Sequence, residues 1–115
     1  MKTQEMVRLA QQQLDAYNLR DLEAFCACYH PEVEVVDLVD RKTVVSGLVE
    51  FKTKYQALFS SSPQLRCELK SRIILDASVI DEEWITGASR YPDGLHAVAI
   101  YSFREGLIDR VWFPG

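Results

Sequence analysis

The sequence predicts an α+β domain in which a curved antiparallel sheet, shaped like a cone, packs on three helices. Two observations carry this prediction. Apolar residues recur with a helical period in two segments near the start of the chain and in one near its middle. From residue 65 onward apolar and polar residues alternate instead, as they do in half-buried strands. The expected order of elements is therefore ααββαββββ.

The three helices are expected at residues 3–18, just after Asn18-Leu-Arg, and at about 48–59. In the first helix one broad face is apolar, and Gln13 falls near its middle. Asp21 is a suitable N-cap for the short second helix, because its carboxylate can accept a free backbone N–H. The buried stripe of this second helix comprises Leu22, Phe25, Cys26 and Tyr29.

Strands account for most of the remaining chain. Tyr91–Gly94 and Glu105-Gly106 hold residues that tight turns favour, so both are expected to join neighbouring strands. The strands are expected at residues 32–39, 42–46, 65–75, 79–90, 95–103 and 107–113.

Length, charge and cysteine number limit the classes of function. The 115 residues fit one domain, 1–115, which can bury a core without disulfides. A formal charge of −4 leaves no basic patch, so nucleic acid and anionic membranes are not expected partners. An odd number of cysteines, three, is typical of free thiols in a reducing compartment, and no signal-peptide core opens the chain. We therefore expect a cytoplasmic protein.

Asp37 is the first candidate functional residue. It alternates with Val33, Val35 and Val39, and alternate residues of a strand share one face. A carboxylate on an apolar face must be paired, neutralised or used. Asp37 is thus either a proton-transfer base, whose pKa burial would raise, or a structural carboxylate with a bonded partner.

Other candidates follow from position. Gln13 is expected to lie near Asp37 in a cavity between sheet and helices, as a ligand donor or as a core glutamine bonded to backbone. By contrast, Glu82-Glu83 is expected on a solvated strand edge. Two isolated histidines predict no metal site, and no motif predicts a cofactor. The side chains expected to line the cavity are Tyr17, Phe25, Tyr55, Trp84, Ala99 and Tyr101.

The sheet is apolar on both faces. Val98 and Ile100 alternate away from the expected cavity, and Val36 and Leu38 are apolar on that same side. A second apolar face needs a second cover, which a symmetric partner supplies. The expected assembly is a homodimer.

Three segments, Tyr17–Phe25, Tyr29–Asp37 and Ala99–Phe113, resemble the nuclear transport factor 2-like superfamily, particularly its SnoaL-like and ketosteroid-isomerase-like members. The resemblance implies a cystatin-like fold over nearly the whole chain. It implies less about function, because this fold serves isomerases, dehydratases, cyclases, transport factors and plain binding modules.

The resemblance to ketosteroid isomerase implies a general base at Asp37. The tyrosine and aspartic acid that form the oxyanion hole of that enzyme correspond to Gln13 and Ala99 here, so ketosteroid isomerisation itself is not implied. We expect a cofactor-free isomerase, dehydratase or cyclase for a small apolar carbonyl compound, with Asp37 as base and Gln13 or Tyr101 as donor. The alternatives are a non-catalytic module that binds a small ligand and a protein-interaction module.

Overall fold

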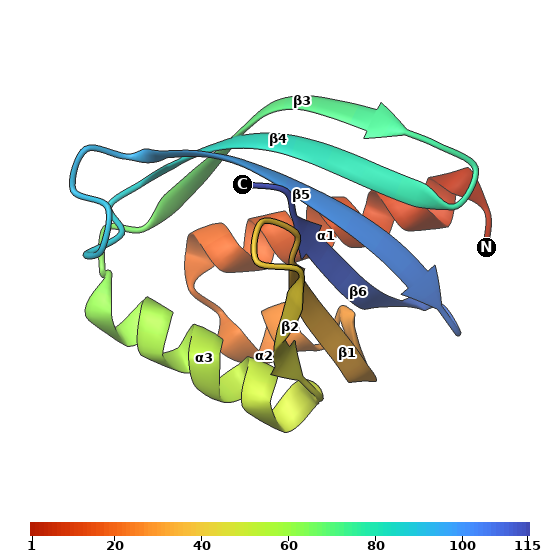
Figure 1. Cartoon of the computed structure of the whole chain (residues 1–115), viewed down its shortest axis with the longest axis horizontal. Coiled ribbons are helices and arrows are strands. Elements are labelled where there is room, and N and C mark those ends of the chain that lie inside the picture. Colours follow the sequence, from red (N-terminus) through yellow and green to blue (C-terminus); the bar gives the residue numbers. More distant parts are fainter.

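The computed structural model describes residues 1–115 and confirms the expected order of helices and strands (Figure 1). The chain forms three helices and six strands. None of the helices is long and apolar enough to cross a membrane. The elements are α1 (Thr3–Leu19), α2 (Leu22–Cys26), β1 (Tyr29–Asp37), β2 (Lys42–Ser46), α3 (Leu48–Ser61), β3 (Arg66–Ile74), β4 (Ser78–Thr86), β5 (Leu95–Arg104) and β6 (Leu107–Phe113).

The six strands form one curved sheet in the order β2-β1-β6-β5-β4-β3, and the helices cover its concave face (Figure 1). Every neighbouring pair is antiparallel except β1 and β6, which run parallel. The expectation of a purely antiparallel sheet is therefore wrong at this one pairing. Turn residues indicate hairpins between consecutive strands, but β1 and β6 meet only because the whole intervening chain folds back.

Local signals in the sequence set several of these boundaries. The Asp21 carboxylate accepts the backbone N–H of Ala24, which confirms it as the N-cap of α2. Glu105 and Gly106 both have positive φ, as a two-residue hairpin of this twist requires. β4 ends at Thr86, earlier than predicted. The next residue, Gly87, lies so close to Gln64 that a Cβ there would be 2.0 Å from the Gln64 carbonyl oxygen, so only glycine fits.

The end of α1 is tied to the start of β3. The Asn18 side chain donates to the carbonyl of Cys67 at 2.9 Å and accepts its N–H at 2.7 Å. The guanidinium of Arg20, whose backbone is left-handed, donates to the carbonyl of Leu65 at 2.8 Å. These bonds fix the angle at which α1 crosses the sheet.

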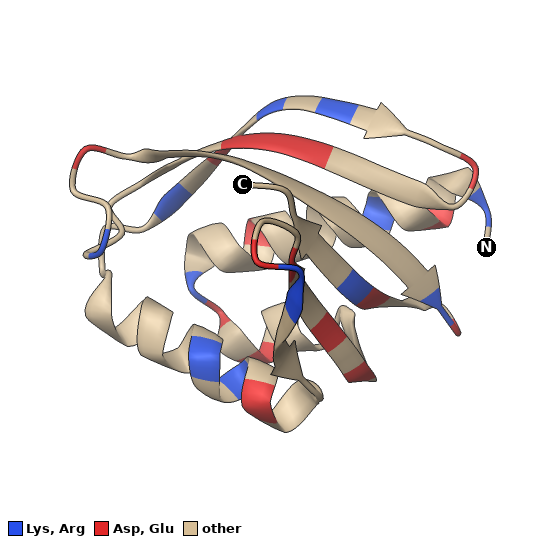
Figure 2. Cartoon of the chain, viewed as in Figure 1, with Lys and Arg blue, Asp and Glu red and all other residues tan.

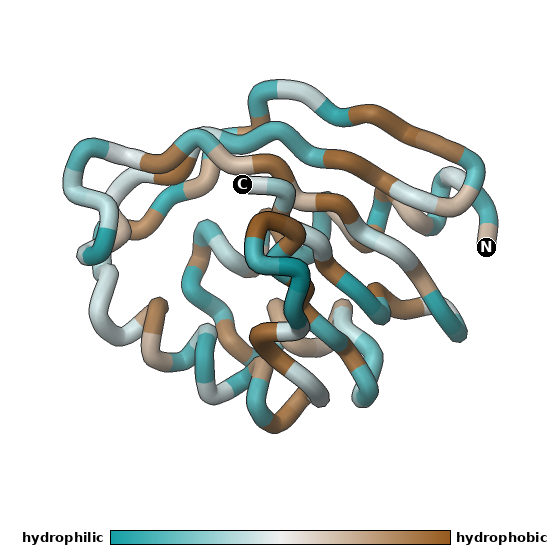
Figure 3. The backbone as a smooth tube through the Cα atoms, in the orientation of Figure 1, coloured by the Kyte–Doolittle hydropathy of each residue, from teal (hydrophilic) through white to brown (hydrophobic).

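The core lies between the helices and the concave face of the sheet. Met6 and Ala10 of α1 pack there with Val33 and Val35 of β1. All three cysteines are free, as expected, and all three are buried. Brown apolar segments in Figure 3 also mark the ends of the β3–β4 and β1–β2 hairpins, outside this core.

Candidate functional site

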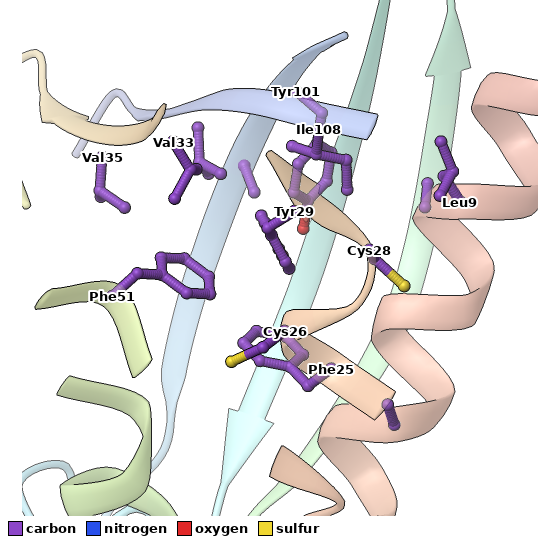
Figure 4. Packing of buried hydrophobic residues seen from close by; sticks show 14 of the residues in the cluster. Leu9, Phe25, Cys26, Cys28, Tyr29, Val33, Val35, Phe51, Tyr101 and Ile108 are labelled. Carbon is purple, nitrogen blue, oxygen red and sulfur yellow. The ribbon is translucent and has the colours of Figure 1, made fainter. Parts of the chain in front are cut away.

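The space inside the cone is occupied by aromatic side chains (Figure 4). Phe25 of α2 lies among them, 4.8 Å from the ring centroid of Tyr55 and 5.1 Å from that of Tyr29. Two surface hollows of about 520 and 320 Å³ are present, and Phe59 is the one ring of this cluster that lines either. The expected cavity is thus filled by rings on the helix side. The cluster comprises Tyr17, Phe25, Tyr29, Phe51, Tyr55 and Phe59.

Gln13 joins two tyrosines in this interior. Its Oε1 accepts the Tyr29 hydroxyl at 2.9 Å, and its Nε2 donates to the carbonyl of Ala10 at 3.0 Å and to the Tyr101 hydroxyl at 3.1 Å. The amide has therefore used both hydrogens and its orientation is set. The Tyr101 hydroxyl accepts the hydrogen bond from Gln13, so its own hydrogen is free to donate to another group.

Glu83 is a buried acid on the same face of the sheet as Tyr101, and the sequence interpretation of it is wrong. Its side chain lies on the concave face of β4 with 6% of the residue exposed. Burial, helped by the charge of Asp81, raises the pKa of Glu83 to about 7. Its neighbour Glu82 points the other way and binds His96 at 2.7 Å and Ser71 at 2.9 Å.

A buried ion pair stands beside Glu83. Asp81 is fully buried, and Arg72 of β3 donates to its two oxygens at 2.7 and 3.0 Å. Arg72 also donates to Oε1 of Gln11 at 3.1 Å, so the pair ties α1 to both strands. Figure 2 shows the acidic segment in the middle of β4, with basic residues on the adjoining β3.

Hydroxyl and thiol groups complete the surroundings of Glu83. Burial raises the pKa of Tyr17, Tyr55 and Tyr101, and the charge of Glu83 adds to each rise. The Cys67 thiol is a diagonal neighbour of Glu83 on the same face of the sheet, since Leu69 pairs with Glu83. Burial raises the pKa of Cys67, and the thiol in turn opposes the rise at Glu83. Glu83 can therefore accept a proton near neutral pH, while the neighbouring tyrosine hydroxyls and the Cys67 thiol stay protonated.

The structure does not bring Asp37 to Gln13. Asp37 ends β1 half-buried, and its carboxylate accepts the N–H of Val39 at 2.9 Å and of Asp40 at 3.3 Å. The expected contact with Gln13 is wrong, because the register with β2 shifts after Val35 and the valine alternation stops there. This geometry assigns Asp37 a role in closing the β1–β2 turn.

The expected cavity-lining residues separate into two groups. Phe25, Ala99 and Tyr101 are buried in the interior, and Tyr17 and Tyr55 are half-buried at its margin. Trp84 is a correction: it faces the outer side of β4, where it pairs with His96. There its ring packs on Gly94, at which a Cβ would come within 2.5 Å. Val79, Asp81 and Glu83 alternate along the sequence, and this pattern indicates a shared face for Glu83 just as the valine alternation does for Asp37.

Comparison with known proteins places this fold in a family. Residues 10–111 match the model of the SnoaL-like domain, and the chain therefore belongs to the SnoaL-like domain family. No curated protein matches the sequence.

Solved structures with the same fold share little sequence. An uncharacterised cystatin-fold protein from Novosphingobium aromaticivorans is 22% identical with a TM-score of 0.85, over 100% of this chain and 99% of that one. A candidate ketosteroid isomerase from Kribbella flavida is 18% identical with a TM-score of 0.81, over 97% and 79%. A candidate polyketide cyclase from Sinorhizobium meliloti is 16% identical with a TM-score of 0.79, over 98% and 99%. At these identities the likeness defines the fold and not the activity.

Proposed function

We propose that this chain carries out acid–base chemistry on a small apolar compound with a carbonyl group, which reaches Glu83 when rings of the aromatic cluster move aside, since neither surface hollow is lined by Glu83. Glu83 is the proton-transfer group and Tyr101 the hydrogen-bond donor. The observation that carries the proposal is a buried carboxylate whose pKa burial raises to about 7 and whose charge also raises the pKa of Tyr101, the tyrosine that accepts a bond from Gln13. A general base is most effective when its pKa lies near the working pH.

The proposed step uses both groups together. Ionised Glu83 accepts a proton from the carbon next to the substrate carbonyl. The carbonyl oxygen gains negative charge as the enolate forms, and the Tyr101 hydroxyl donates to it. Protonated Glu83 then returns the proton to the same or a neighbouring carbon, which gives exchange or isomerisation without a cofactor. A candidate ketosteroid isomerase and a candidate polyketide cyclase share this fold, so the fold is compatible with this class of chemistry.

A second function is favoured by a separate observation. Aromatic rings fill the helix side of the interior, and such a surface can hold an apolar ligand without reacting with it. In this alternative the chain is a non-catalytic binding module, and Glu83 and Tyr101 orient the ligand.

Hydrogen exchange next to a carbonyl tests the proposal. Cyclic ketones are incubated with the protein in deuterium oxide, and loss of the neighbouring C–H signals is followed by nuclear magnetic resonance. We expect exchange that rises with pH through about 7, as Glu83 ionises, and that Glu83→Gln abolishes.

Two matched variants make the test specific. Glu82→Gln changes the adjacent acid on the outer face and should retain exchange, as should Asp37→Asn. Loss in Asp37→Asn with retention in Glu83→Gln would identify Asp37 as the base instead. Ketone binding without exchange in any variant would favour the binding module.

A further inference from the structure

We propose that the smaller surface hollow is the entrance to Glu83, that the Phe59 ring closes it, and that it admits an apolar ring compound bearing an oxygen substituent. This inference rests on the proposed function only in taking Glu83 as the group that the ligand must reach. The hollow has a volume of about 320 Å³ and lies where the turn after α1 faces the end of α3. Its lining residues are Arg20, Leu22, Gln56, Phe59, Ser60 and Pro63.

Phe59 is the layer between this hollow and the interior. The residue is 9% exposed, and its ring packs edge-on against Tyr17 with centroids 5.5 Å apart. On its other sides lie Phe25 at 5.6 Å and Tyr55 at 6.2 Å. The pKa of both tyrosines is raised in part by Glu83, so they lie within the electrostatic reach of that carboxylate. In this proposal, rotation of the Phe59 ring opens the hollow toward Tyr17 and Tyr55, and past these rings toward Glu83.

The wall opposite Phe59 is held in place. Asn18 bonds both backbone groups of Cys67, and Arg20 bonds the carbonyl of Leu65. On the α3 side, the hydroxyl of Ser62 accepts the N–H of Ser89 at 3.0 Å, beyond the helix end. Arg20 of the lining is thus held by a backbone bond, and in this proposal the Phe59 ring near the end of α3 is the element that turns.

The lining of the hollow selects the ligand class. Leu22, Phe59 and Pro63 provide apolar surface, whereas Arg20 and Gln56 provide N–H donors at the rim. A ring system with a carbonyl, hydroxyl or carboxylate oxygen satisfies both. The larger hollow on the outer sheet face is lined mainly by charged residues and holds ion pairs such as Arg104 with Glu32, so it does not suit such a compound.

Thiol labelling tests the route without any substrate. Cys67 lies beside Glu83, so its modification by methyl methanethiosulfonate, a small uncharged reagent, reports access to the site. The native protein is labelled at fixed pH, and peptide mass spectrometry follows Cys67, Cys26 and Cys28 separately. Phe59→Leu should raise the Cys67 rate at least about tenfold, the factor that about 1.4 kcal/mol of easier opening gives.

Three further variants separate the entrance from a mere loss of stability. Phe51→Leu shortens a more deeply buried ring of the same cluster, one that does not line the hollow, and should leave the Cys67 rate near that of the wild type. Ser60→Trp places a large ring at an exposed position of the hollow and should slow labelling of Cys67 alone. Ser46→Trp does the same at the larger hollow and should have no effect.

The outcomes either support or overturn the entrance. Selective acceleration of Cys67 in Phe59→Leu, with slowing in Ser60→Trp, supports it. Equal acceleration of all three cysteines, or an equal effect of Phe51→Leu, means that labelling follows unfolding and overturns it. Because no turnover is measured, failure of ketone exchange would leave this result unaffected, and the reverse also holds.

Discussion

At the scale of single residues, Glu82 and Glu83 show that the sheet face on which a side chain lies determines its pKa. The two acids are adjacent, yet β4 turns them to opposite faces. The pKa of Glu82 is lowered by hydrogen bonds from His96 and Ser71, whereas burial raises that of Glu83 to about 7. Only the second is suited to exchange protons near neutral pH.

The raised pKa of Glu83 predicts a pH-dependent stability. A folded-state pKa above the unfolded value of 4.5 means that the folded chain binds the proton more tightly. This contribution is complete below pH 4.5 and is lost as pH rises through about 7, at a cost of about 3 kcal/mol for this group. Urea unfolding at pH 5 and pH 8 should therefore show Glu83→Gln gaining stability relative to wild type at the higher pH.

The exposed Glu68 on β3 supplies the control for this measurement. Glu68→Gln should run parallel to wild type over the same pH range. If Glu83→Gln also ran parallel, the carboxylate would be ionised throughout and could not serve as a base tuned to neutral pH.

At the scale of elements, the Arg72–Asp81 pair joins β3, β4 and α1 in one buried contact. Gln11 of α1 accepts the remaining Nη1 donor of Arg72. A buried ion pair adds little net stability, but removing one partner leaves the other charge without compensation. The pair therefore holds the packing of α1 on the strands that carry Glu83.

Arg72→Met should lower the free energy of unfolding by about 3–5 kcal/mol, since Asp81 is then left buried and unpaired. Changing both, as Arg72→Met with Asp81→Leu, should recover much of that loss. Thermal or urea unfolding measures both effects. Lys70→Met, which breaks a surface pair with Glu68, should change stability by less than about 1 kcal/mol. An equally small effect of Arg72→Met would contradict the structural role.

At the scale of the whole molecule, an apolar row crosses the outer face of the sheet. Ile80 pairs with Ile100, Ile100 with Trp112, and Trp112 with Val36, so β4, β5, β6 and β1 all contribute. Each of these side chains is half-buried in the single chain. An apolar face left partly uncovered in this way is typical of an interface.

We propose that a second copy of the chain covers this row as a symmetric homodimer, with an interface of at least about 1,000 Å² in total. Light scattering at micromolar concentration should give the mass of a dimer. Ile100→Glu places a charge in the middle of the row and should produce monomer. Val49→Glu, at a position 85% exposed on α3, should leave the dimer intact. A wild-type monomer would disprove the assembly.

Much of the architecture was determined by the sequence alone. The period of the apolar residues predicted three helices and six strands in order, and Asp21 and Glu105-Gly106 predicted a cap and a hairpin turn that the structure contains. These features depend on near neighbours in the chain, so the residues involved are enough to specify them. Gln13 on an apolar helix face correctly indicated a buried amide.

The tertiary structure decided which residues form the candidate site. Alternation shows which residues share a strand face, but both faces of β4 carry apolar and acidic residues, so only packing against the helices places Glu83 inside and Trp84 outside. The shift after Val35 that turns Asp37 into a turn residue depends on pairing with β2. The parallel contact of β1 with β6 likewise joins distant segments. Such long-range contacts are set by burial of the whole core, which no local pattern records.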